Sequence, residues 1–459
     1  MMTSYADFLA SKRVLAPAIG PRVLTADVNP VLFPFQREIV RWAVHKGRAA
    51  VWADTGLGKT LIQLEWARLV GERTLILAPL AVAEQTIRMG SDMLGIEVQY
   101  ARHQGEATGQ ITITNYERLH RFDLASFGAV VLDESSILKS FSGVTKKALI
   151  AGFANTPYRL ACTATPAPND IEELCNHAHF LGVMTPAEMR STFFIADNRG
   201  EFMKYRLKKH AKTAFYRWLA SWAMAVKKPS DLGFEDDGFA LPPLSIEAQF
   251  IGTDWKPEGL LFFTELHGVT ERAQVRRATV AGRVAAVAKL IEAEPDEPWL
   301  IWCGLNDEGR DLAKLIPGAV VVEGADDPEE KAAALLKFAA GETRVLITKV
   351  SIAGFGLNFQ RCARMAFLGL GDSFEQYYQA IRRCWRFGQT RPVTAWIVLS
   401  TLEEAIYQNV LQKERQAVEL STELIAHAAE YERAELFVGT SMADDFEPRN
   451  EIEVPTWLS

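Results

Sequence analysis

The segment ADTGLGKT, Ala53 to Thr60, ends as a phosphate-binding loop ends, with glycine, lysine and threonine in succession. It departs from the pattern G-x-x-x-x-G-K-[ST] only at Ala53, and this alanine is acceptable if the backbone there is not left-handed. An apolar run, AAVWA, precedes the loop and an amphipathic stretch follows it, so a strand should lead into the loop and the loop into a helix. Backbone N–H groups at such a helix N-terminus face the phosphates of a nucleotide. Lys59 would neutralise the β- and γ-phosphates, and Thr60 would hold Mg²⁺.

The other loop residues are candidate contacts of the nucleotide through their backbone: Thr55, Gly56, Leu57 and Gly58. The plainer interpretation is a solvated lysine beside a glycine turn. The setting between strand and helix favours the nucleotide site.

A pair of carboxylates, Asp133 and Glu134, follows a second apolar run in VVLDESS. Adjacent acids at a strand end can divide two tasks, with Asp133 ordering Mg²⁺ and Glu134 polarising the attacking water. Alone, such a pair is more often a solvated loop. Together with the upstream loop it predicts the second half of an ATPase site.

Two arginines, Arg383 and Arg386, lie three residues apart in QAIRRCWRFGQ, which spans Gln379 to Gln389. On a helix this spacing projects both from one face. Guanidinium groups suit the charge that develops on a γ-phosphate better than lysine does. An ordinary basic helix face is the alternative. The chain has one phosphate loop, so a nucleotide held by Lys59 and contacted by these arginines would lie in a cleft between two lobes.

Two blocks of short apolar runs alternate with amphipathic stretches, which predicts parallel sheets covered by helices on both faces. The first block contains RAAVWAD, RTLILAP, GAVVLDES and YRLACTATP; the second contains PWLIWCG, AVVVEG, TRVLITKV, RMAFLGL and VTAWIVLS. Between the blocks, residues 204–228 hold eight lysines and arginines and no acid. Lys208, Lys209 and Lys212 are therefore candidate contacts of nucleic-acid phosphates. The interleaved Phe, Tyr and Trp residues are more simply helix core.

The bulk composition is that of a globular protein with more than one domain. The chain has 459 residues, 48% of them hydrophobic, and a net charge of −7, which by itself does not suggest a nucleic-acid binder. No apolar run reaches the roughly 18–20 residues that span a bilayer, and we expect no membrane partner. Five scattered cysteines indicate a reducing, cytoplasmic location, which would be the bacterial host cytoplasm if the chain is phage-encoded.

With these motifs in place, the chain resembles superfamily 2 DNA helicases and translocases. The closer resemblance is to the Swi/Snf-type branch and to short bacteriophage helicases of the DEAD/DEAH-box-like kind. It extends from about residue 30 to 415 and is most specific in QAIRRCWRFGQ. The resemblance implies an α/β fold of two tandem RecA-like lobes with a basic helical insertion between them, ATP and Mg²⁺ as cofactors, and DNA as the track. Replication, recombination or nuclease proteins are conceivable partners.

The resemblance also assigns roles by position. FPFQREIV is similar to the adenine-reading Q motif, LAPLAVAEQ and ITNYERL to motifs that grip a nucleic-acid backbone, TATPAPND to a coupling motif, and IAGFGLNF to a glycine-bearing motif of the second lobe. The residues implied are Gln36 for adenine, Gly356 for the nucleotide, Pro79, Thr114 and Asn115 for nucleic acid, and Thr163, Thr165 and Gln379 for coupling.

Three positions depart from the family pattern. Ser136 stands where D-E-x-H motifs end in histidine, and Arg382 and Trp385 replace an acid and a histidine of the Swi/Snf version. These changes bear on how hydrolysis is coupled to movement more than on hydrolysis itself.

The expected division is an N-terminal extension (1–30), lobe one (31–183), the basic insertion and linker (184–242), lobe two (243–415), and a C-terminal helix with an acidic tail (416–459). Two other functions stay open. RNA helicases usually end the arginine motif in G-R, whereas this chain has Gly388 and Gln389. An ATP-gated module that clamps DNA without moving along it would not need intact catalytic residues.

Overall fold

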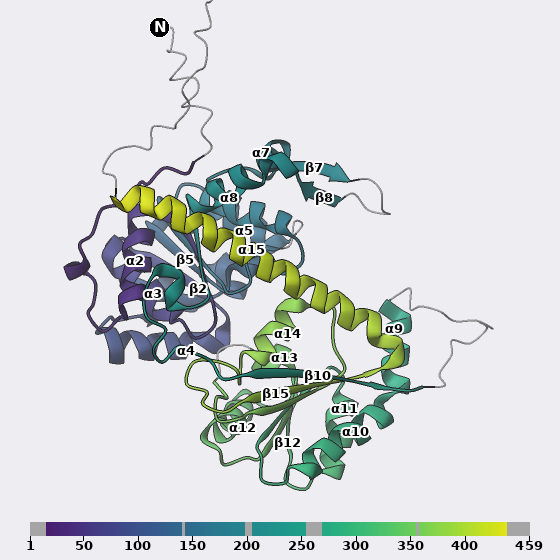
Figure 1. Cartoon of the computed structure of the whole chain (residues 1–459). Helices are drawn as coiled ribbons and strands as arrows, with labels where there is room; N and C mark the ends of the chain where they lie inside the picture. Colours follow the sequence, from purple (N-terminus) through teal and green to yellow (C-terminus); the bar gives the residue numbers. More distant parts are fainter. Residues whose placement is uncertain (1–14, 140–142, 198–203, 254–268, 355–357, 438–459) are drawn as a thin grey trace, which may run out of the picture.

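The computed structural model describes residues 15–139, 143–197, 204–253, 269–354 and 358–437. These residues form two lobes, each built on a parallel sheet, with one long helix extending along both (Figure 1). This is the predicted α/β fold with two tandem RecA-like lobes.

The first sheet has seven strands in the order β3-β4-β2-β5-β6-β1-β9, and all neighbouring pairs are parallel. Its central strands are buried along their whole length, as expected for a sheet covered on both faces. The carboxyl ends of parallel strands meet at one edge, where the polar loops of the sequence gather. The strands are β1 (Arg48–Ala53), β2 (Thr74–Ala78), β3 (Gln99–Tyr100), β4 (Ile111–Asn115), β5 (Ala129–Asp133), β6 (Tyr158–Cys162) and β9 (Ala223–Val226).

Helices cover both faces of this sheet. One core cluster joins α2 (Pro34–Lys46), α3 (Lys59–Val70) and α4 (Leu80–Met89) to one set of strand side chains. A second cluster joins the alternate set to the helices of the other face. Those helices are α5 (Val144–Gly152), α6 (Leu174–Leu181), α7 (Pro186–Phe193) and α8 (Lys212–Ala220).

The second sheet has six parallel strands in the order β10-β15-β14-β11-β13-β12. Its helices also lie on both faces, with α10 and α11 in one core cluster and α12, α13 and α14 in the other. The strands are β10 (Leu244–Ile251), β11 (Trp299–Cys303), β12 (Val320–Val322), β13 (Val345–Thr348), β14 (Arg364–Leu368) and β15 (Val393–Ser400). The helices are α9 (Val269–Ala278), α10 (Val280–Ala293), α11 (Asn306–Leu315), α12 (Pro328–Ala340), α13 (Val350–Ala353) and α14 (Phe374–Ile381).

The basic segment is not a separate insertion as its charge suggested. Strand β9 pairs with β1 and completes the first sheet, and Trp218 and Trp222 are buried in the core of that lobe. The expectation that its aromatic residues form core is confirmed. What projects from the lobe is α7 and an antiparallel hairpin, β7 (Phe194–Asp197) and β8 (Lys204–Leu207) (Figure 1). The boundary placed at residue 183 therefore divides one core in two.

The boundary placed at residue 415 also falls inside an element. Helix α15 (Glu404–Phe437) is continuous over 34 residues. Its start packs on the second lobe through Ile406 and Val410, and Leu420 and Leu424 lie in the core of the first lobe. The helix thus ties the two lobes together. Neither α15 nor any other helix within the described ranges is long and apolar enough to cross a membrane.

Candidate nucleotide site and nucleic-acid interface

The predicted phosphate loop lies between β1 and α3, at the carboxyl edge of the first sheet. Gly56 and Gly58 have φ angles of 96° and 80°, a region that side chains other than glycine rarely adopt. Ala53, by contrast, is the last residue of β1 and has extended backbone, so alanine is accommodated there without strain. The local geometry explains both the glycines that are kept and the one that is replaced.

Gln36 of α2 contacts the phosphate loop at Leu57 and Gly58. Its Nε2 donates to the carbonyl of Leu57 at 2.9 Å, its Oε1 accepts from the N–H of Phe33 at 2.9 Å, and a side chain at Gly58 would collide with it. The residue is buried, and both ends of its amide have one partner each. Its contact with adenine stays a prediction, because the structure shows it as a brace of the loop.

Lys59 begins α3 and lies across the loop. Its Nζ donates to the carbonyls of Ala53 at 2.9 Å and of Asp54 at 3.4 Å. Two carbonyl groups satisfy an ammonium only in part, so the lysine remains available for phosphate oxygens. Thr60 follows in the first turn of α3, and its contact with Mg²⁺ stays a prediction.

The acid pair lies at the end of β5, next to the loop. Gln63 of α3 donates from Nε2 to Asp133 Oδ1 at 2.7 Å, and the Tyr116 hydroxyl donates to the Asp133 carbonyl at 2.6 Å. Glu134 has a φ of 50° and is the one non-glycine residue with positive φ in the described part of the chain. Such backbone strain is concentrated at functional sites.

Burial and charge tune these two acids. Burial is the main cause that raises the pKa of Glu134 to about 7; Asp133 and Glu375 raise it further, while Lys59 and Arg383 lower it. Burial likewise raises the pKa of Asp133, which the hydrogen bond from Gln63 and the charge of Lys59 oppose. A carboxylate with a pKa near neutrality is suited to accept a proton from water.

The predicted coupling residues lie beside Glu134. Thr163, just after β6, donates from Oγ1 toward Glu134 Oε2 at 3.5 Å, and its Oγ1 accepts from the N–H of Thr165 at 3.1 Å. In the second lobe, Gln379 Oε1 accepts from Arg383 Nη2 at 2.8 Å and the Gln379 carbonyl accepts from Nε at 3.1 Å. Both groups therefore touch side chains that are predicted to act in hydrolysis, Glu134 and Arg383.

The two predicted arginines do not lie on a helix. Helix α14 ends at Ile381, and Arg383 and Arg386 occupy the turn that follows. This turn still faces the first lobe, because Arg382 pairs with Asp54 and a Cβ atom at Gly56 would lie 2.9 Å from Cβ of Phe387. Gly356, the other second-lobe residue predicted for the nucleotide, lies outside the described residues.

The Arg386 side chain is half-buried and forms no hydrogen bond or ion pair with the residues that the structure describes, whereas its carbonyl accepts from the N–H of Gln389 at 3.0 Å. Burial, together with the neighbouring charges of Arg383 and Arg382, lowers the pKa of its guanidinium to about 9. Two further donors in this region, Gln379 Nε2 and Arg382 Nη1, are buried without a hydrogen-bond partner. Unpaired buried donors and crowded positive charges together favour an anion between the lobes.

Two of the three residues that depart from the family pattern, Ser136 and Arg382, contact the other lobe. The Ser136 hydroxyl donates to Glu375 of α14, and Lys139 pairs with the same carboxylate. Arg382 pairs with Asp54 of the phosphate loop. Sequence reasoning had noted Ser136 and Arg382 only as replacements, since their partners lie hundreds of residues away.

The first-lobe residues predicted for nucleic acid lie together at the carboxyl edge of the sheet. Pro79 caps α4 directly after β2, and Thr114 and Asn115 end the neighbouring strand β4. Thr114 Oγ1 and Asn115 Oδ1 are buried without a hydrogen-bond partner. Their contact with nucleic acid stays a prediction.

A hollow of about 260 Å³ lies at the carboxyl ends of β11, β13 and β14 in the second lobe. Its cationic residues are Arg276 and Lys349, and a Cβ atom at Gly304 or Gly369 would collide with the Arg276 guanidinium. Sequence reasoning missed this hollow. The signal was the position of Lys349 directly after a fully buried strand.

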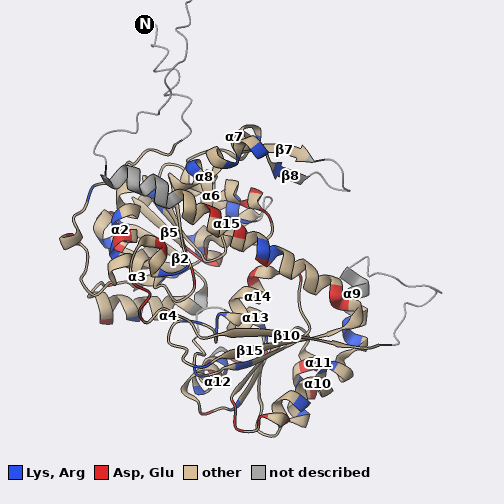
Figure 2. Cartoon of the chain, viewed as in Figure 1, with Lys and Arg blue, Asp and Glu red and all other residues tan. Residues whose placement is uncertain are grey.

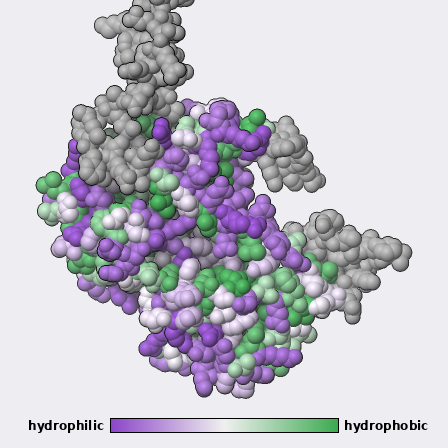
Figure 3. All heavy atoms as spheres, viewed as in Figure 1, coloured by the Kyte–Doolittle hydropathy of each residue, from purple (hydrophilic) through white to green (hydrophobic). Residues whose placement is uncertain are grey.

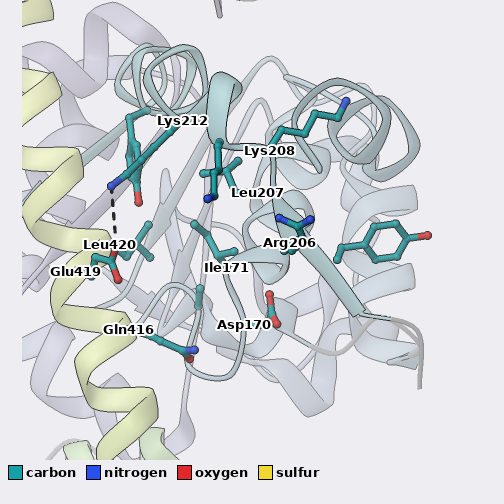
Figure 4. A pocket seen from close by; sticks show the side chains of 13 residues that line it. Asp170, Ile171, Arg206, Leu207, Lys208, Lys212, Gln416, Glu419 and Leu420 are labelled. Carbon is teal, nitrogen blue, oxygen red and sulfur yellow. Dashed lines mark ion pairs between the residues drawn. The ribbon is translucent and has the colours of Figure 1, made fainter. Parts of the chain in front are cut away.

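The predicted lysines of the basic segment line a second hollow, of about 430 Å³, between α8 and α15 (Figure 4). Lys212 Nζ pairs with Glu423 at 2.7 Å and with Glu419 at 3.9 Å. Acids of α15 therefore compensate this lysine (Figure 4), contrary to the expectation that no acid does. Both acidic and basic residues lie along α15 (Figure 2). Lys208 donates to two backbone carbonyls, whereas Lys209 is exposed. Hydrophilic residues cover much of the face of the molecule seen in Figure 3, with hydrophobic residues scattered among them.

Residues 282–388 match the family model of the helicase conserved C-terminal domain. The match extends from α10 to the turn that carries Arg383 and Arg386. The second lobe is therefore similar to the helicase conserved C-terminal domain, which supports the resemblance to helicases.

Two individual proteins are similar to the chain. "Putative protein p41" of Acyrthosiphon pisum secondary endosymbiont phage 1 is 32% identical over 176 residues, which cover 32% of this chain and 38% of that relative. The Sulfolobus solfataricus SWI2/SNF2 ATPase core in complex with dsDNA aligns over 90% of this chain and 98% of its own, with 18% identity and a TM-score of 0.42.

Proposed function

We propose that this chain is an ATP-dependent DNA translocase or helicase whose active site is assembled from both lobes. One observation carries the proposal: the arginine turn of the second lobe faces the phosphate loop and the acid pair of the first. Arg382 reaches Asp54, the charge of Arg383 acts on Glu134, and Arg386 is half-buried without a counter-ion among the described residues. This arrangement is suited to an anion that binds one lobe and is completed by the other.

The residues present fit ATP and Mg²⁺. The glycines of the loop leave its backbone open to phosphates, and Lys59 is held beside it by two carbonyls. Thr60 and Asp133 would hold Mg²⁺, which supplies charge neutralisation on the phosphates. Glu134 would orient the attacking water and accept its proton. Arg383 and Arg386 would stabilise charge on the phosphoryl group as the bond to ADP breaks.

The carboxyl edges of the two sheets are the proposed track for DNA. Pro79, Thr114 and Asn115 would contact the backbone from the first lobe, and Arg276 and Lys349 from the second. Closing and opening of the cleft would change the distance between these two sets, and such a domain motion can move a bound strand. Comparing ATP turnover with single-stranded DNA, duplex DNA and RNA tests the proposal. Stimulation by RNA alone would make it an RNA helicase.

Replacing Arg386 by alanine should lower DNA-stimulated ATP turnover by about 10²-fold, while ATP and DNA still bind. The groups that hold the ground state, Lys59 and the metal ligands, all lie in the first lobe. The arginine contributes when charge develops on the transferred phosphoryl group. Lysine should restore little, because a point charge does not reproduce the planar guanidinium.

Steady-state hydrolysis and equilibrium binding of labelled ATP and DNA provide the measurements. Arg310→Ala is the matched control, since Arg310 pairs with Glu323 on the surface of the second lobe. Full turnover in Arg386→Ala would mean that the lobes do not share one active site, and the binding module would replace the translocase.

Neutralising Lys209 should flatten the salt dependence of DNA binding by up to about one unit of slope for the lost phosphate contact. Lys212→Gln should leave the slope unchanged, because Glu423 and Glu419 already neutralise that lysine. Titrations of both variants at several salt concentrations make the comparison. Equal slopes for wild type and Lys209→Gln would leave Lys209 as a solvated side chain.

A further inference from the structure

Helix α14 and its C-cap dock the second lobe onto the first through one polar face. Glu375, Tyr378 and Arg382 follow one another at intervals of three and four residues, which places them on the same side of the helix. All three contact residues of the first lobe. Glu375 accepts a hydrogen bond from the Ser136 hydroxyl and pairs with Lys139. The Tyr378 hydroxyl donates to Asp54, and Arg382 forms an ion pair with the same carboxylate. The docking therefore has two polar patches, one beside the acid pair and one at the phosphate loop.

Asp54 is the centre of the patch at the phosphate loop. Its Oδ1 accepts from the N–H of Thr55 at 2.6 Å and from the Tyr378 hydroxyl, and its Oδ2 accepts from Arg382 Nη2. The carboxylate thus shapes the loop from within and binds the second lobe at the same time. In the described residues, both partners from the second lobe belong to the segment that leads into the arginine turn.

Arg382 is enclosed by aromatic rings. Its guanidinium lies 4.2 Å from the ring centroid of Trp385 and 5.2 Å from that of Tyr378. The side chains of Arg382 and Asp54 are only 8% and 16% exposed. An ion pair so removed from water depends strongly on its geometry and contributes specificity of docking more than stability. The two replacements in the arginine motif, Arg382 and Trp385, thus form one structural unit.

The arginine turn and the phosphate loop are tightly packed against each other. A Cβ atom at Gly56 would lie 2.9 Å from Cβ of Phe387, so the arginine turn rests directly on the backbone of the phosphate loop. Phe387 also packs on Phe239 of the linker, with ring centroids 4.9 Å apart. A small shift of the turn would therefore move Arg383 and Arg386 relative to the loop.

We propose that Asp54 and Arg382 are a pair of positioning residues that dock the arginine turn on the phosphate loop and so place Arg383 and Arg386 for hydrolysis. The inference rests on the proposed function. Neither residue needs to touch the reacting atoms: Arg382 acts through the arginines next to it in the chain, and Asp54 acts through the loop.

A double-mutant cycle of Asp54→Asn and Arg382→Gln tests the pair. Each single variant should lower kcat by about tenfold, because a displaced arginine stabilises the transition state less. The double variant should be no slower than the slower single one, since the ion pair is lost only once. ATP affinity, measured in the Glu134→Gln background where turnover is suppressed, should stay within about twofold, a difference of only about 0.4 kcal/mol.

Conservative variants sharpen the result. Asp54→Glu keeps the carboxylate and should retain most of the activity, whereas Arg382→Lys should recover little, because lysine lacks the planar group that stacks on Trp385. Arg310→Gln, which breaks a surface ion pair within the second lobe, is the matched control and should have wild-type kcat. If the two single effects multiplied to about a hundredfold in the double variant, or if ATP affinity fell instead of kcat, the proposal would be wrong.

A measurement without ATP turnover separates this inference from the proposed function. All five native cysteines are buried, so dyes can be attached selectively at Asp92→Cys and Glu342→Cys, one exposed position on each lobe. Energy transfer between the dyes should fall equally in both single variants and no further in the double variant. If the wild type lacked ATPase activity but its variants showed this pattern of energy transfer, the proposed function would be wrong, whereas the role of Asp54 and Arg382 in docking would be supported. Unchanged energy transfer in an active enzyme would overturn the pair alone.

Discussion

The variant Glu134→Gln should bind ATP with near-normal affinity and hydrolyse it about 10³-fold more slowly. Glutamine keeps the size of the side chain and its approach to Thr163, and Asp133, the proposed metal ligand, is unchanged. What disappears is the group that takes a proton from water. Equilibrium binding of ATP and single-turnover hydrolysis measure the two effects separately, and Glu117→Gln, an exposed acid of the same lobe, is the matched control.

The pH dependence of kcat/KM gives the same prediction a second readout. A general base works in its ionised form, and burial raises the pKa of Glu134 to about 7. In the wild type, kcat/KM should therefore rise as the pH increases through about 7 and then level off. In Glu134→Gln this rise should disappear. Loss of ATP binding in the variant would instead make Glu134 a structural or metal-binding residue.

Lys59→Ala should abolish measurable ATP turnover, a loss of about 10³-fold or more, while the fold remains intact. The carbonyls of Ala53 and Asp54 accept hydrogen bonds from the Lys59 ammonium and from no other lysine among the described residues. Its removal has a second consequence, because the charge of Lys59 lowers the pKa of Glu134. Without it the base should be ionised only at higher pH.

Hydrolysis assays, together with circular dichroism and thermal unfolding to verify the fold, measure this outcome. Lys147→Ala, an exposed lysine on α5, is the matched control and should be fully active. Near-normal turnover in a folded Lys59→Ala protein would remove the nucleotide-site assignment and with it the proposed function.

Local patterns were enough to predict much of the fold and the first-lobe half of the candidate nucleotide site. The strands β1, β2, β5 and β6 and five strands of the second sheet are continuous apolar runs, because both faces of these sheets are covered. The phosphate loop and the acid pair are likewise local, since each is a short segment at the end of one strand.

Elements without such a pattern were missed. Strand β9 has only four residues and follows a basic helix, so its place in the first sheet was not visible. Strand β10 lies at the edge of the second sheet and is half-exposed along its length, which removes the apolar run. Helix α15 was recognised as helical, but its passage from one lobe to the other depends on where Leu420 and Leu424 pack.

Tertiary structure alone decided what joins the two halves of the site. Arg382 and Asp54 are 328 positions apart, Glu375 and Ser136 are 239 apart, and Lys212 and Glu423 are 211 apart. The charges at these positions show what kind of partner each residue could have, but not which partner. An ion pair requires the two side chains to be close, and the sequence does not say which residues of the two lobes are close. Packing of α14 and α15 against the first lobe supplies that proximity. It brings Arg382, with Trp385 against its guanidinium, into contact with Asp54 of the phosphate loop.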